Sequence, residues 1–495
     1  MTQVTIPSDI TGWLNKVSAG DFGSGNVVAS GEQSFEVFDP GTALPLATLP
    51  VSSKSSVEQA ISRARKSFES GSWRNASPDH REKVLLALAA LVERDFDFLS
   101  NLEALDTGKP LAEARLDIEE VVTVVRYYAG WANKVSGQTI ASHKDLSAMT
   151  IRGPVGVCAA ITPWNYPLPI LMYKLAPALA FGNSFVAKPS ELAPLSAIYF
   201  VGLCEEAGVP DGVVNLLLGA GATGSDLVSS QGLDKIAFTG SSRTGQAIMA
   251  AAAKNTTKVT LELGGKSPQL VFASCDLERA VAGVAMGIWT NAGQVCVAGS
   301  RLIIEESIKE EFLNRLKKVG EDYFVGHSLD PKSSMGPIIS AAQLEKIRTA
   351  LDGAKKDGAS LHSLGNISDQ LGHFMNPTIV DDLPISHAMD QEEIFGPVLT
   401  VSTFSSESEA IELANSTRYG LAAGVWTGKA GQAQRVAREI HSGTVWVNTY
   451  GAFHPTLPFG GTKSSGFGRE LGESAVEGYT ELKTIVEDIS EAEEN

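Results

Sequence analysis

The sequence predicts an α/β fold built from two blocks in series. From Pro154 onward, short apolar runs alternate with helical segments, beginning at "VGVCAAIT" and ending at "KVTLELG". After Cys296 the alternation resumes, from "RLIIEES" to "GTVWVNT". Strands that alternate with helices indicate βαβ units, whose parallel sheets carry helices on both faces. Two such blocks predict two domains, with the functional site in the cleft between them.

The first 135 residues are expected to be helical. From Val57 to Phe68, apolar side chains recur at the spacing of one helix face. Ser77 followed by Pro78 is typical of an N-cap and a first helical position, so a helix is expected through "REKVLLALAALVERDFDFL". A valine-rich run that leads to Tyr128 marks one face of a further helix.

Residues 137–153 interrupt the first block. Their sequence, "GQTIASHKDLSAMTIRG", alternates weakly between apolar and polar side chains, which indicates an extended hairpin rather than a core element. Beyond it, helices are expected from Leu168 to Phe181 and from Pro194 to Ala207, each after an apolar run. The second block adds helices that begin at Ile308 or lie near Ile411 and Val436.

Composition narrows the function classes. The chain has 495 residues and a net charge of −17, whereas a nucleic-acid-binding protein needs a basic surface. Its four cysteines lie far apart and match no zinc spacing, which favours reduced thiols in a cytoplasmic protein and no metal site. The start of the chain lacks the pattern of a secretory signal, and no apolar run has the length of a membrane span.

Two glycine turns have the character of phosphate-binding loops. "LLLGAGATG" contains Gly219-x-Gly221-x-x-Gly224 after an expected strand, but the acidic residue required about 20 residues later is absent. "AFTGSSRTG" places Gly240 and Ser241 between a strand and an alanine-rich helix, where backbone N–H groups would face an anion. The first motif is therefore interpreted equally well as a dinucleotide-binding loop or as a structural turn between a strand and a helix.

Several polar residues stand at expected strand ends or in tight loops. Asn165 lies between two aromatic residues in "TPWNYP", where its amide would either donate to an oxyanion or hold a turn. Glu262 lies inside a strand, so a paired or a functional carboxylate is expected. In "NAGQVCVAGS", Cys296 is either a buried thiol or a nucleophile, and the window alone leaves both open.

Together, these segments resemble the NAD(P)-dependent aldehyde dehydrogenase superfamily over nearly the whole chain. The resemblance is greatest to the branch that contains the broad-range NAD-dependent and betaine-aldehyde enzymes. It is carried by nine motifs in the family's order: "DTGKP", "TPWNYP", "KPSE", "FTGSSRTG", "LELGGKSP", "GQVCVAGSR", "EEIFGPV", "GLAAGVWT" and "PFGGTKSSGFGRELGE".

The resemblance implies a catalytic set. Cys296 would be the nucleophile that forms a thiohemiacetal and then a thioester, with Asn165 and the Cys296 N–H holding the oxyanion. Glu262 would activate the water that hydrolyses the thioester. Lys174 and Glu470 match positions that relay protons from that base.

The resemblance also implies an NAD site. Lys188 and Glu191 match the residues that bind the adenosine ribose, and a glutamate there disfavours the 2′-phosphate of NADP. The phosphates are assigned to the Gly240 turn, so the Gly219–Gly224 turn lies on the adenine side. The remaining cofactor positions are Trp164, Gly221, Ser241, Leu263, Glu393 and Phe395.

The substrate positions implied by the resemblance are largely aromatic. An aromatic tunnel suits an apolar or aromatic aldehyde of medium size, and also suits a quaternary ammonium through cation–π contact. Tyr173 and Thr290 stand where the betaine-aldehyde branch carries tryptophan, which favours the apolar alternative over a betaine-aldehyde or aminoaldehyde substrate. The full set is Tyr166, Tyr173, Trp289, Thr290, Tyr450, Phe453 and Phe459.

The implied architecture has three parts. Residues 1–136 and 154–263 would form a Rossmann-like NAD-binding domain, and residues 264–478 an α/β catalytic domain. Residues 137–153 and 479–495 would form a small β oligomerisation arm that pairs subunits into a homodimer or a homotetramer. Three rivals stay open: a CoA-acylating or phosphorylating enzyme, a structural protein on this fold, and a cofactor-binding module without chemistry. The presence of Glu262, Asn165 and Cys296 argues against all three.

Overall fold

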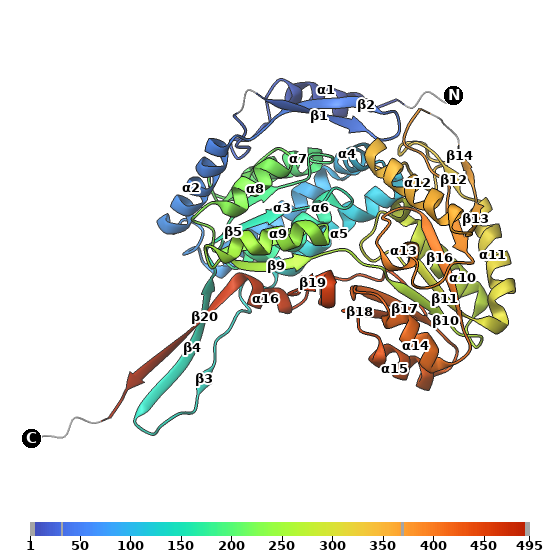
Figure 1. Ribbon diagram of the computed structural model, residues 1–495. Coiled ribbons are helices and arrows are strands. Elements are labelled where there is room, and N and C mark those ends of the chain that lie inside the picture. The colour runs from blue at the N-terminus through green and yellow to red at the C-terminus, as the bar shows by residue number, and fades with distance from the viewer. Residues whose placement is uncertain (1–4, 31–32, 368–370, 491–495) are drawn as a thin grey trace, which may run out of the picture.

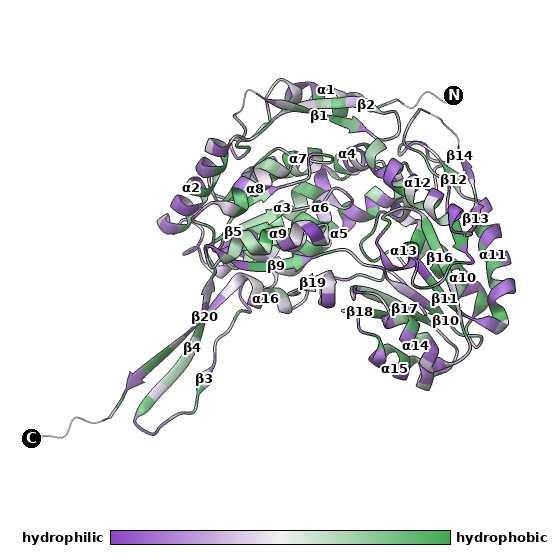
Figure 2. Cartoon of the chain, in the orientation of Figure 1, coloured by the Kyte–Doolittle hydropathy of each residue, from purple (hydrophilic) through white to green (hydrophobic). Residues whose placement is uncertain are grey.

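The computed structural model describes the chain except residues 1–4, 31–32, 368–370 and 491–495. Figure 1 shows two α/β lobes side by side and a thin arm that projects from one of them. The strands of both lobes are hydrophobic (Figure 2), as expected for sheets covered on both faces. One continuous cluster of buried apolar side chains extends through both lobes, from Leu171 in the first to Ile338 in the second.

The first lobe contains a six-stranded sheet in the order β19-β9-β8-β5-β6-β7. Its strands are β5 (Val157–Ile161), β6 (Ser184–Lys188), β7 (Val214–Leu216), β8 (Lys235–Thr239), β9 (Lys258–Glu262) and β19 (Gly466–Phe467). All pairs are parallel except the short β19 with β9. The chain proceeds from β5 outward to β7 and then continues on the other side at β8. Ligands bind at such a switch of strand order, beyond the carboxyl ends of the strands.

The helices of this lobe follow the sequence-based expectation closely. Ser77 accepts a hydrogen bond from the His80 N–H at 3.2 Å and Pro78 opens the helix after it. The crossover helices are α6 (Pro167–Ala180), α7 (Leu195–Glu206), α8 (Gly221–Ser229) and α9 (Ser242–Ala253). The N-terminal helices are α1 (Ser8–Ser18), α2 (Lys54–Ser70), α3 (Pro78–Arg94), α4 (Phe96–Thr107) and α5 (Leu111–Ala129).

The expectation that the first 135 residues are helical is wrong for residues 34–50. They form an antiparallel hairpin of β1 (Ser34–Asp39) and β2 (Leu44–Pro50). Val37 and Leu49 are fully buried while the residues beside them in the chain are more exposed, which is the two-residue period of a strand. The hairpin also contacts the second lobe, because Asp39 Oδ2 lies 2.9 Å from His327 Nε2.

The second lobe contains a seven-stranded sheet in the order β13-β15-β16-β11-β10-β17-β18. Only β13 is antiparallel to its neighbour. The strands are β10 (Pro268–Val271), β11 (Arg301–Glu305), β13 (Ser360–Ser363), β15 (Thr378–Asp381), β16 (Val398–Phe404), β17 (Ala422–Trp426) and β18 (Thr444–Val447). The helices are α10 (Leu277–Trp289), α11 (Lys309–Glu321), α12 (Ala341–Lys356), α13 (Ala388–Gln391), α14 (Glu407–Asn415) and α15 (Ala430–Glu439).

The arm is a three-stranded sheet. β3 (Thr139–Ile140) and β4 (Leu146–Pro154) form the expected hairpin, and β20 (Thr480–Asp488) pairs with β4 along its whole length. The short helix α16 (Ser474–Tyr479) joins β20 to the body of the first lobe (Figure 1). Residues 491–495 of the expected arm lie outside the described residues. The α/β fold class is confirmed, whereas the exact domain limits stay a prediction.

Candidate active site

A cavity of about 190 Å³ brings most of the predicted site together. Residues that follow β5, β8 and β9 in the first lobe line it together with loops of the second lobe. The predicted residues that line it are Trp164, Asn165, Gly240, Ser241, Glu262, Leu263, Cys296, Glu393 and Phe395. The cavity therefore lies beyond the carboxyl ends of the parallel strands, where the switch of strand order places a ligand.

The loop before Cys296 has an unusual backbone. The 3₁₀ turn η1 (Thr290–Gly293) follows α10, and within it Asn291 and Ala292 have φ angles of 49° and 53°. A left-handed conformation costs a residue with a Cβ atom about 1–2 kcal/mol. The turn is anchored to the other lobe, since the Asn291 amide donates to the Asn165 carbonyl at 3.0 Å.

Asn165 faces the cysteine loop. It follows β5 directly and is nearly fully buried, and its Nδ2 donates to the Gln294 carbonyl at 2.9 Å. That contact uses one of its two N–H groups and orients the amide beside Cys296. The other N–H is available for an oxygen bound in the cavity that both residues line.

The Cys296 thiol is not acidic on its own. Burial raises its pKa to about 12, and the negative charges of Glu393 and Glu262 add to that effect. The thiolate is the nucleophilic form, so this thiol needs a base, a cation or a bound group before it reacts. The sequence alone did not show which group ionises the Cys296 thiol. Among the charges that act on it in the structure, none belongs to a cationic side chain.

Glu262 is a buried carboxyl group with a basic character. Neither of its oxygens has a close hydrogen-bond partner among the described side chains, and burial raises its pKa well above the ordinary value. A Cβ atom on residue 460 would lie 2.6 Å from Glu262 Oε1, so glycine at this position leaves room for the carboxylate. In its ionised form, such a group binds a proton more tightly than an ordinary glutamate, as a general base requires.

Lys174 and Glu470 form a buried ion pair near Glu262. The Lys174 ammonium contacts the Glu470 carboxylate and donates to Thr239 Oγ1 at 2.7 Å. The charges of both residues act on the Glu262 carboxyl, Glu470 raising its pKa and Lys174 lowering it. The structure thus places the two predicted relay residues behind the predicted base.

One set of cofactor candidates lies at the end of β8. Ser241 is the N-cap of α9 and accepts a hydrogen bond from the Thr244 N–H at 3.2 Å. A Cβ on residue 240 would lie 2.5 Å from the Phe238 ring, so Gly240 keeps this turn tight. Leu263 closes the same side and packs over Gly245. Ser241 lines the cavity at the positive end of a twelve-residue helix.

Three other cofactor candidates lie outside the cavity. Lys188 is at the end of β6, where burial lowers its pKa to about 8 and its ammonium donates to the Pro189 carbonyl at 2.9 Å. Glu191 Oε2 is 4.0 Å from that ammonium and faces solvent in part. Gly221 is the first residue of α8. These residues follow β6 and β7, and the cavity-lining residues follow β5 and β8 of the same sheet.

Glu393 and Phe395 cover the cavity from the second lobe. Glu393 Oε1 accepts a hydrogen bond from the Gly265 N–H at 3.0 Å, and burial raises the pKa of Glu393 to about 7. The Phe395 ring stands edge-on to the Trp164 ring at 5.2 Å. Gln343, which the sequence analysis missed, holds this loop by donating to the Phe395 carbonyl at 2.9 Å. Gln343 lies on α12, outside every motif, so no sequence signal marked it.

Three of the predicted substrate residues form an aromatic cluster with Trp446. Phe453 lies 5.4 Å from the Phe459 ring and 5.5 Å from the Trp446 ring. Tyr450 packs on Trp446 at 4.8 Å and donates its hydroxyl to the Val297 carbonyl at 2.6 Å. The cluster therefore adjoins the residue that follows Cys296.

Tyr166 and Tyr173 lie against a group of acidic residues on α5. Tyr173 donates its hydroxyl to Glu120, and the Lys109 ammonium lies 3.9 Å from the Tyr166 ring centroid while it pairs with Asp117. Burial raises the pKa of Glu120 to about 7. We call Glu113, Asp117 and Glu120 the α5 acids; they follow one another along the helix at helical spacing.

Trp289 and Thr290 differ in their placement. The Trp289 ring is fully buried and stands edge-on to Tyr323 at 5.2 Å, between α10 and α11. Thr290 is half-buried and opens the turn before Cys296. The Asn291 N–H beside it donates to Glu113 at 2.9 Å, which links this turn to the α5 acids.

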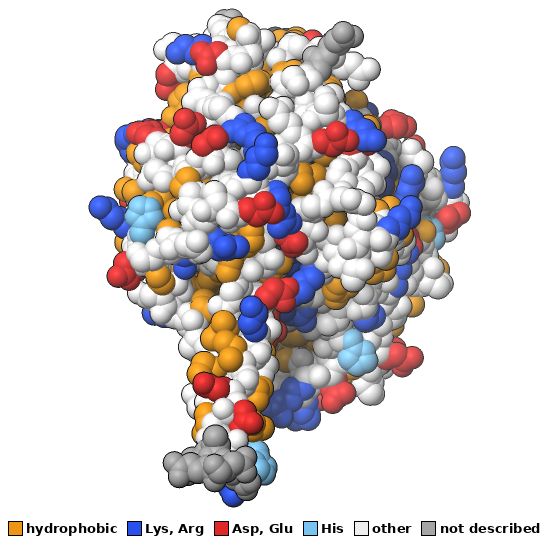
Figure 3. Space-filling view, turned by 90° about the vertical axis from the view of Figure 1, so that its left-hand side faces the viewer, with side chains coloured by type: hydrophobic (Ala, Val, Ile, Leu, Met, Phe, Trp, Pro, Cys, Tyr) orange, Lys and Arg blue, Asp and Glu red, His pale blue; other side chains and the backbone are white. Residues whose placement is uncertain are grey.

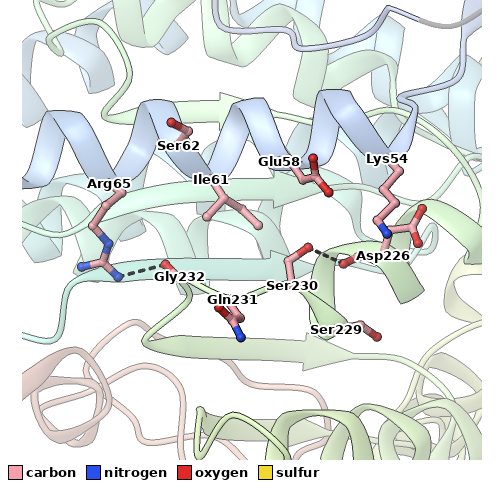
Figure 4. A pocket seen from close by; sticks show the side chains of 10 residues that line it. All are labelled: Lys54, Glu58, Ile61, Ser62, Arg65, Asp226, Ser229, Ser230, Gln231 and Gly232. Atoms are coloured by element: carbon pink, nitrogen blue, oxygen red, sulfur yellow. Dashed lines mark hydrogen bonds between the residues drawn. The ribbon is translucent and has the colours of Figure 1, made fainter.

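A larger groove lies away from these residues. It is bounded by α2, α8 and the loop after α8, and its volume is about 530 Å³. Figure 4 shows Arg65 bonded to the Gly232 carbonyl and Ser230 to that of Asp226, with side chains of both charges along the rim. None of the predicted site residues lines it. In the described part of the chain, no cluster of three potential metal ligands occurs, and every helix is too short or too polar to span a bilayer.

Known proteins match the chain over nearly its full length. The family model described as aldehyde dehydrogenase family matches residues 27–485. A betaine aldehyde dehydrogenase of Bacillus subtilis is 44% identical over 93% of this chain and 95% of its own. Retinaldehyde dehydrogenase 3 of Mus musculus is 43% identical over 92% of this chain and 89% of its own. A betaine aldehyde dehydrogenase structure from Staphylococcus aureus in complex with NAD+ has a TM-score of 0.94 and 38% identity, and the match covers 99% of this chain and 98% of that one.

Proposed function

The chain belongs to the aldehyde dehydrogenase family, and on that premise we propose that it is an NAD-dependent enzyme that oxidises an aldehyde to its carboxylic acid at Cys296. One observation carries the proposal: Cys296, Asn165 and Glu262 line a single cavity. These three side chains come from segments far apart in the sequence, and together they supply a nucleophile, a hydrogen-bond donor and a base.

Cys296 begins the reaction. Its sulfur adds to the aldehyde carbonyl carbon, and the carbonyl oxygen becomes an oxyanion that Asn165 Nδ2 and the Cys296 N–H stabilise by hydrogen bonds. The bond between Asn165 and the Gln294 carbonyl supports this role, because it holds the amide in place before substrate arrives. Since burial raises the pKa of the free thiol to about 12, ionisation is coupled to the binding of cofactor or substrate.

The residues at the carboxyl ends of β6 and β8 fit a dinucleotide. Lys188 and Glu191 would hold the adenosine ribose, the Ser241 N-cap the phosphates, and Glu393 with Phe395 the nicotinamide end. NAD held there would supply the hydride acceptor, and loss of the hydride would convert the thiohemiacetal on Cys296 into a thioester. The solved relative from Staphylococcus aureus supports the choice of NAD.

Glu262 completes the reaction. Its carboxylate takes a proton from water, and the resulting hydroxide attacks the thioester carbon and releases the carboxylate product and the Cys296 thiol. The buried pair of Lys174 and Glu470 would carry that proton onward. This base favours an acid-forming enzyme over an acylating or phosphorylating one.

For the substrate, we propose an apolar or aromatic aldehyde of medium size. The cluster of Tyr450, Phe453, Phe459 and Trp446 beside Val297 supports it, because an apolar chain gains about 25 cal/mol for each Å² of surface that it buries there. The mouse relative, named for retinaldehyde, is consistent with that choice.

A cationic aldehyde is the second candidate, and the α5 acids favour it. Glu113, Asp117 and Glu120 share one buried lysine, Lys109, so the region lacks positive charge when the acids ionise. An ammonium group beside Tyr166 and Tyr173 would supply that charge and gain cation–π contact. The Bacillus relative, named for betaine aldehyde, is consistent with a cationic substrate, and its sequence identity is similar to that of the mouse relative.

The arm supports a homo-oligomer. Figure 3 shows hydrophobic side chains along the arm. The exposed apolar residues of these strands include Leu146, Met149 and Ile151 of β4 and Leu482 and Val486 of β20. β20 is at the edge of the three-stranded sheet, where an unpaired strand invites another chain. We expect a dimer or tetramer in sedimentation analysis.

The cysteines bear on the location of the protein. All four are free, which supports a cytoplasmic location.

The deciding experiment follows NADH formation with matched aldehydes. 3-Phenylpropanal and trimethylammonioacetaldehyde are compared at equal concentration, with NAD or NADP, in wild-type protein and in Cys296→Ala. Reduction of NAD that is lost in Cys296→Ala supports the chemistry, and the ratio of kcat/KM for the two aldehydes chooses the substrate class. Equal turnover by Cys296→Ala would contradict the proposed nucleophile.

A further inference from the structure

Lys235 is a buried cation without a carboxylate partner. It is the first residue of β8 and only 3% exposed. Its ammonium donates to Thr260 Oγ1 and lies 4.9 Å from the centroid of the Tyr479 ring. No ion pair involves this residue within the described ranges. A buried lysine that lacks a counterion is costly, and such groups cluster at functional sites.

The strands connect Lys235 to the catalytic region. Along β8, Lys235 and Thr239 lie on the same face, because alternate residues of a strand share a face. Thr260 and Glu262 share a face of the neighbouring β9 in the same way. Thr239 accepts a hydrogen bond from Lys174, and Thr260 accepts one from Lys235. Lys174 therefore contacts β8, and Lys235 contacts β9, the strand that carries Glu262.

Four charged groups on or beside this part of the sheet are almost completely buried: Lys235 and Glu262 on its strands, Lys174 on α6, and Glu470 after β19. We call them the charge strip. With both lysines protonated and both glutamates ionised, their charges sum to zero. The half-buried Arg469 lies at its edge and donates to backbone carbonyls of Gly461 and Gly468. If Lys235 were neutral, ionised Glu262 would leave the four buried groups with a net negative charge.

We propose that Lys235 is a positioning residue for the hydrolytic step, because its ammonium balances the Glu470 charge and so allows Glu262 to ionise inside the fold. The inference rests on the proposed role of Glu262 as the base. Lys235 touches neither substrate nor cofactor in this scheme and acts only through its charge. The proton that Glu262 takes from water still leaves by way of Lys174 and Glu470.

The surroundings of Lys235 make its charge responsive to pH. Burial, together with the charges of Lys174 and Lys258, lowers its pKa to about 8, while the charges of Cys158 and Glu470 oppose the shift. Tyr479 faces the ammonium from α16. The ammonium is therefore mostly protonated at pH 7 and is lost as the pH rises through 8.

The test separates charge from packing. Lys235→Gln keeps a hydrogen-bond donor for Thr260 but removes the charge, Lys235→Met removes both, and Lys235→Arg keeps the charge. Lys258→Met is the matched control, since Lys258 is exposed on the neighbouring strand and pairs with Glu481 at the surface. For each variant, rapid mixing with NAD and aldehyde resolves the burst of NADH from the steady-state rate between pH 6 and 10.

We expect the Gln and Met variants to show a full burst and a slow steady state at pH 7. Loss of the charge should move the acid limb of the steady-state profile up by about one pH unit, which is a tenfold lower rate at pH 7. Above pH 9, where wild-type Lys235 has lost its proton too, the rates should converge. Lys235→Arg and Lys258→Met should keep the wild-type profile.

Two outcomes would overturn the inference. One is a wild-type profile in folded Lys235→Gln, as judged by circular dichroism. The other is a Lys235→Arg variant with the same pH profile as Lys235→Gln, because the positive charge would then not be the cause of the effect. Glu262→Gln is measured alongside: if it keeps its steady-state rate, the proposed base is wrong, whereas if it loses that rate and Lys235→Gln does not, only the role of Lys235 fails.

Discussion

The charge strip and the α5 acids are two buried groups of charges with opposite balances. In the charge strip, two lysines match two glutamates. At α5, the single Lys109, which precedes the helix, lies near three acids, and burial raises the pKa of both Glu113 and Glu120 to about 7. Both groups adjoin residues of the candidate site. Only in the charge strip do the positive and negative charges cancel without a bound ligand.

The difference separates two kinds of chemistry. In a balanced group the attraction between opposite charges offsets part of their desolvation cost, and a proton can move within the group without changing the total charge. An unbalanced group binds protons when it is empty and releases them when a cation arrives. We therefore propose that the charge strip serves proton transfer and that, for the second candidate, a cationic aldehyde, the α5 acids select the substrate. The following predictions test that division.

The largest effect is expected for Glu262→Gln. Removal of a general base lowers a rate by about 10²- to 10⁴-fold, here in the steady state of acid formation. The NADH burst should persist, because hydride transfer precedes the step in which Glu262 acts. Rapid-mixing absorbance at 340 nm measures both phases. A variant that loses burst and steady state equally would break the assignment of Glu262 to hydrolysis.

A smaller effect is expected for charge removal on α5. Glu113→Gln and Glu120→Gln should each lower kcat/KM for a trimethylammonio aldehyde by about ten- to hundredfold, because an ion pair at low effective dielectric is worth a few kcal/mol. The value for 3-phenylpropanal should change little. Glu119→Gln is the matched control, since Glu119 is exposed on the same helix. Equal losses for both aldehydes would mean that the α5 acids serve the fold only.

The pH dependence of KM should differ between the two aldehydes. With pKa values of about 7, Glu113 and Glu120 gain charge between pH 6 and 8. If a cationic aldehyde binds beside them, its KM should fall by up to about tenfold over this interval. KM for 3-phenylpropanal should stay constant, and initial rates in buffers of constant ionic strength measure both. Parallel curves would argue against direct charge recognition.

The smallest effect is expected in stability. Glu120 has a higher pKa in the folded chain than in the unfolded chain, so it binds more protons when folded and its contribution to stability is lost as the pH rises from about 4.5 through 7. The free energy of unfolding should therefore fall over that window, by an amount on the order of 1 kcal/mol for this group. Urea denaturation at pH 5 and 8 should show a smaller fall in Glu120→Gln. An unchanged difference would mean that Glu120 is not the group that titrates.

The sequence predicted the catalytic cavity better than its surroundings. Asn165, Gly240 and Glu262 stand at the ends of parallel strands, and parallel strands carry their carboxyl ends to one edge of the sheet. The order of the motifs then implied that Cys296 meets them. The apolar runs indicated strands and their ends, whereas the resemblance to the family was needed to bring Asn165, Glu262 and Cys296 into one site.

The β1–β2 hairpin and the α5 acids were beyond the sequence reasoning for different reasons. The hairpin contains prolines and two charged residues, Glu36 and Asp39, and a search for helical spacing does not detect its two-residue period. The helical pattern on α5 identified the valine face correctly. It did not predict that α5 also contacts α3, α4 and α6 on other sides, which buries Asp117 and partly buries Glu113 and Glu120.

The two left-handed residues before Cys296 have an evolutionary consequence. Glycine adopts their backbone angles freely, so Ala292→Gly is expected to relieve strain there. Selection for stability alone would favour that change. Selection for a rigid loop instead favours alanine at position 292. A glycine there would give the Cys296 loop more conformational freedom before the aldehyde binds. In a laboratory evolution experiment, substitution of Ala292 by glycine should therefore increase the free energy of unfolding and decrease kcat.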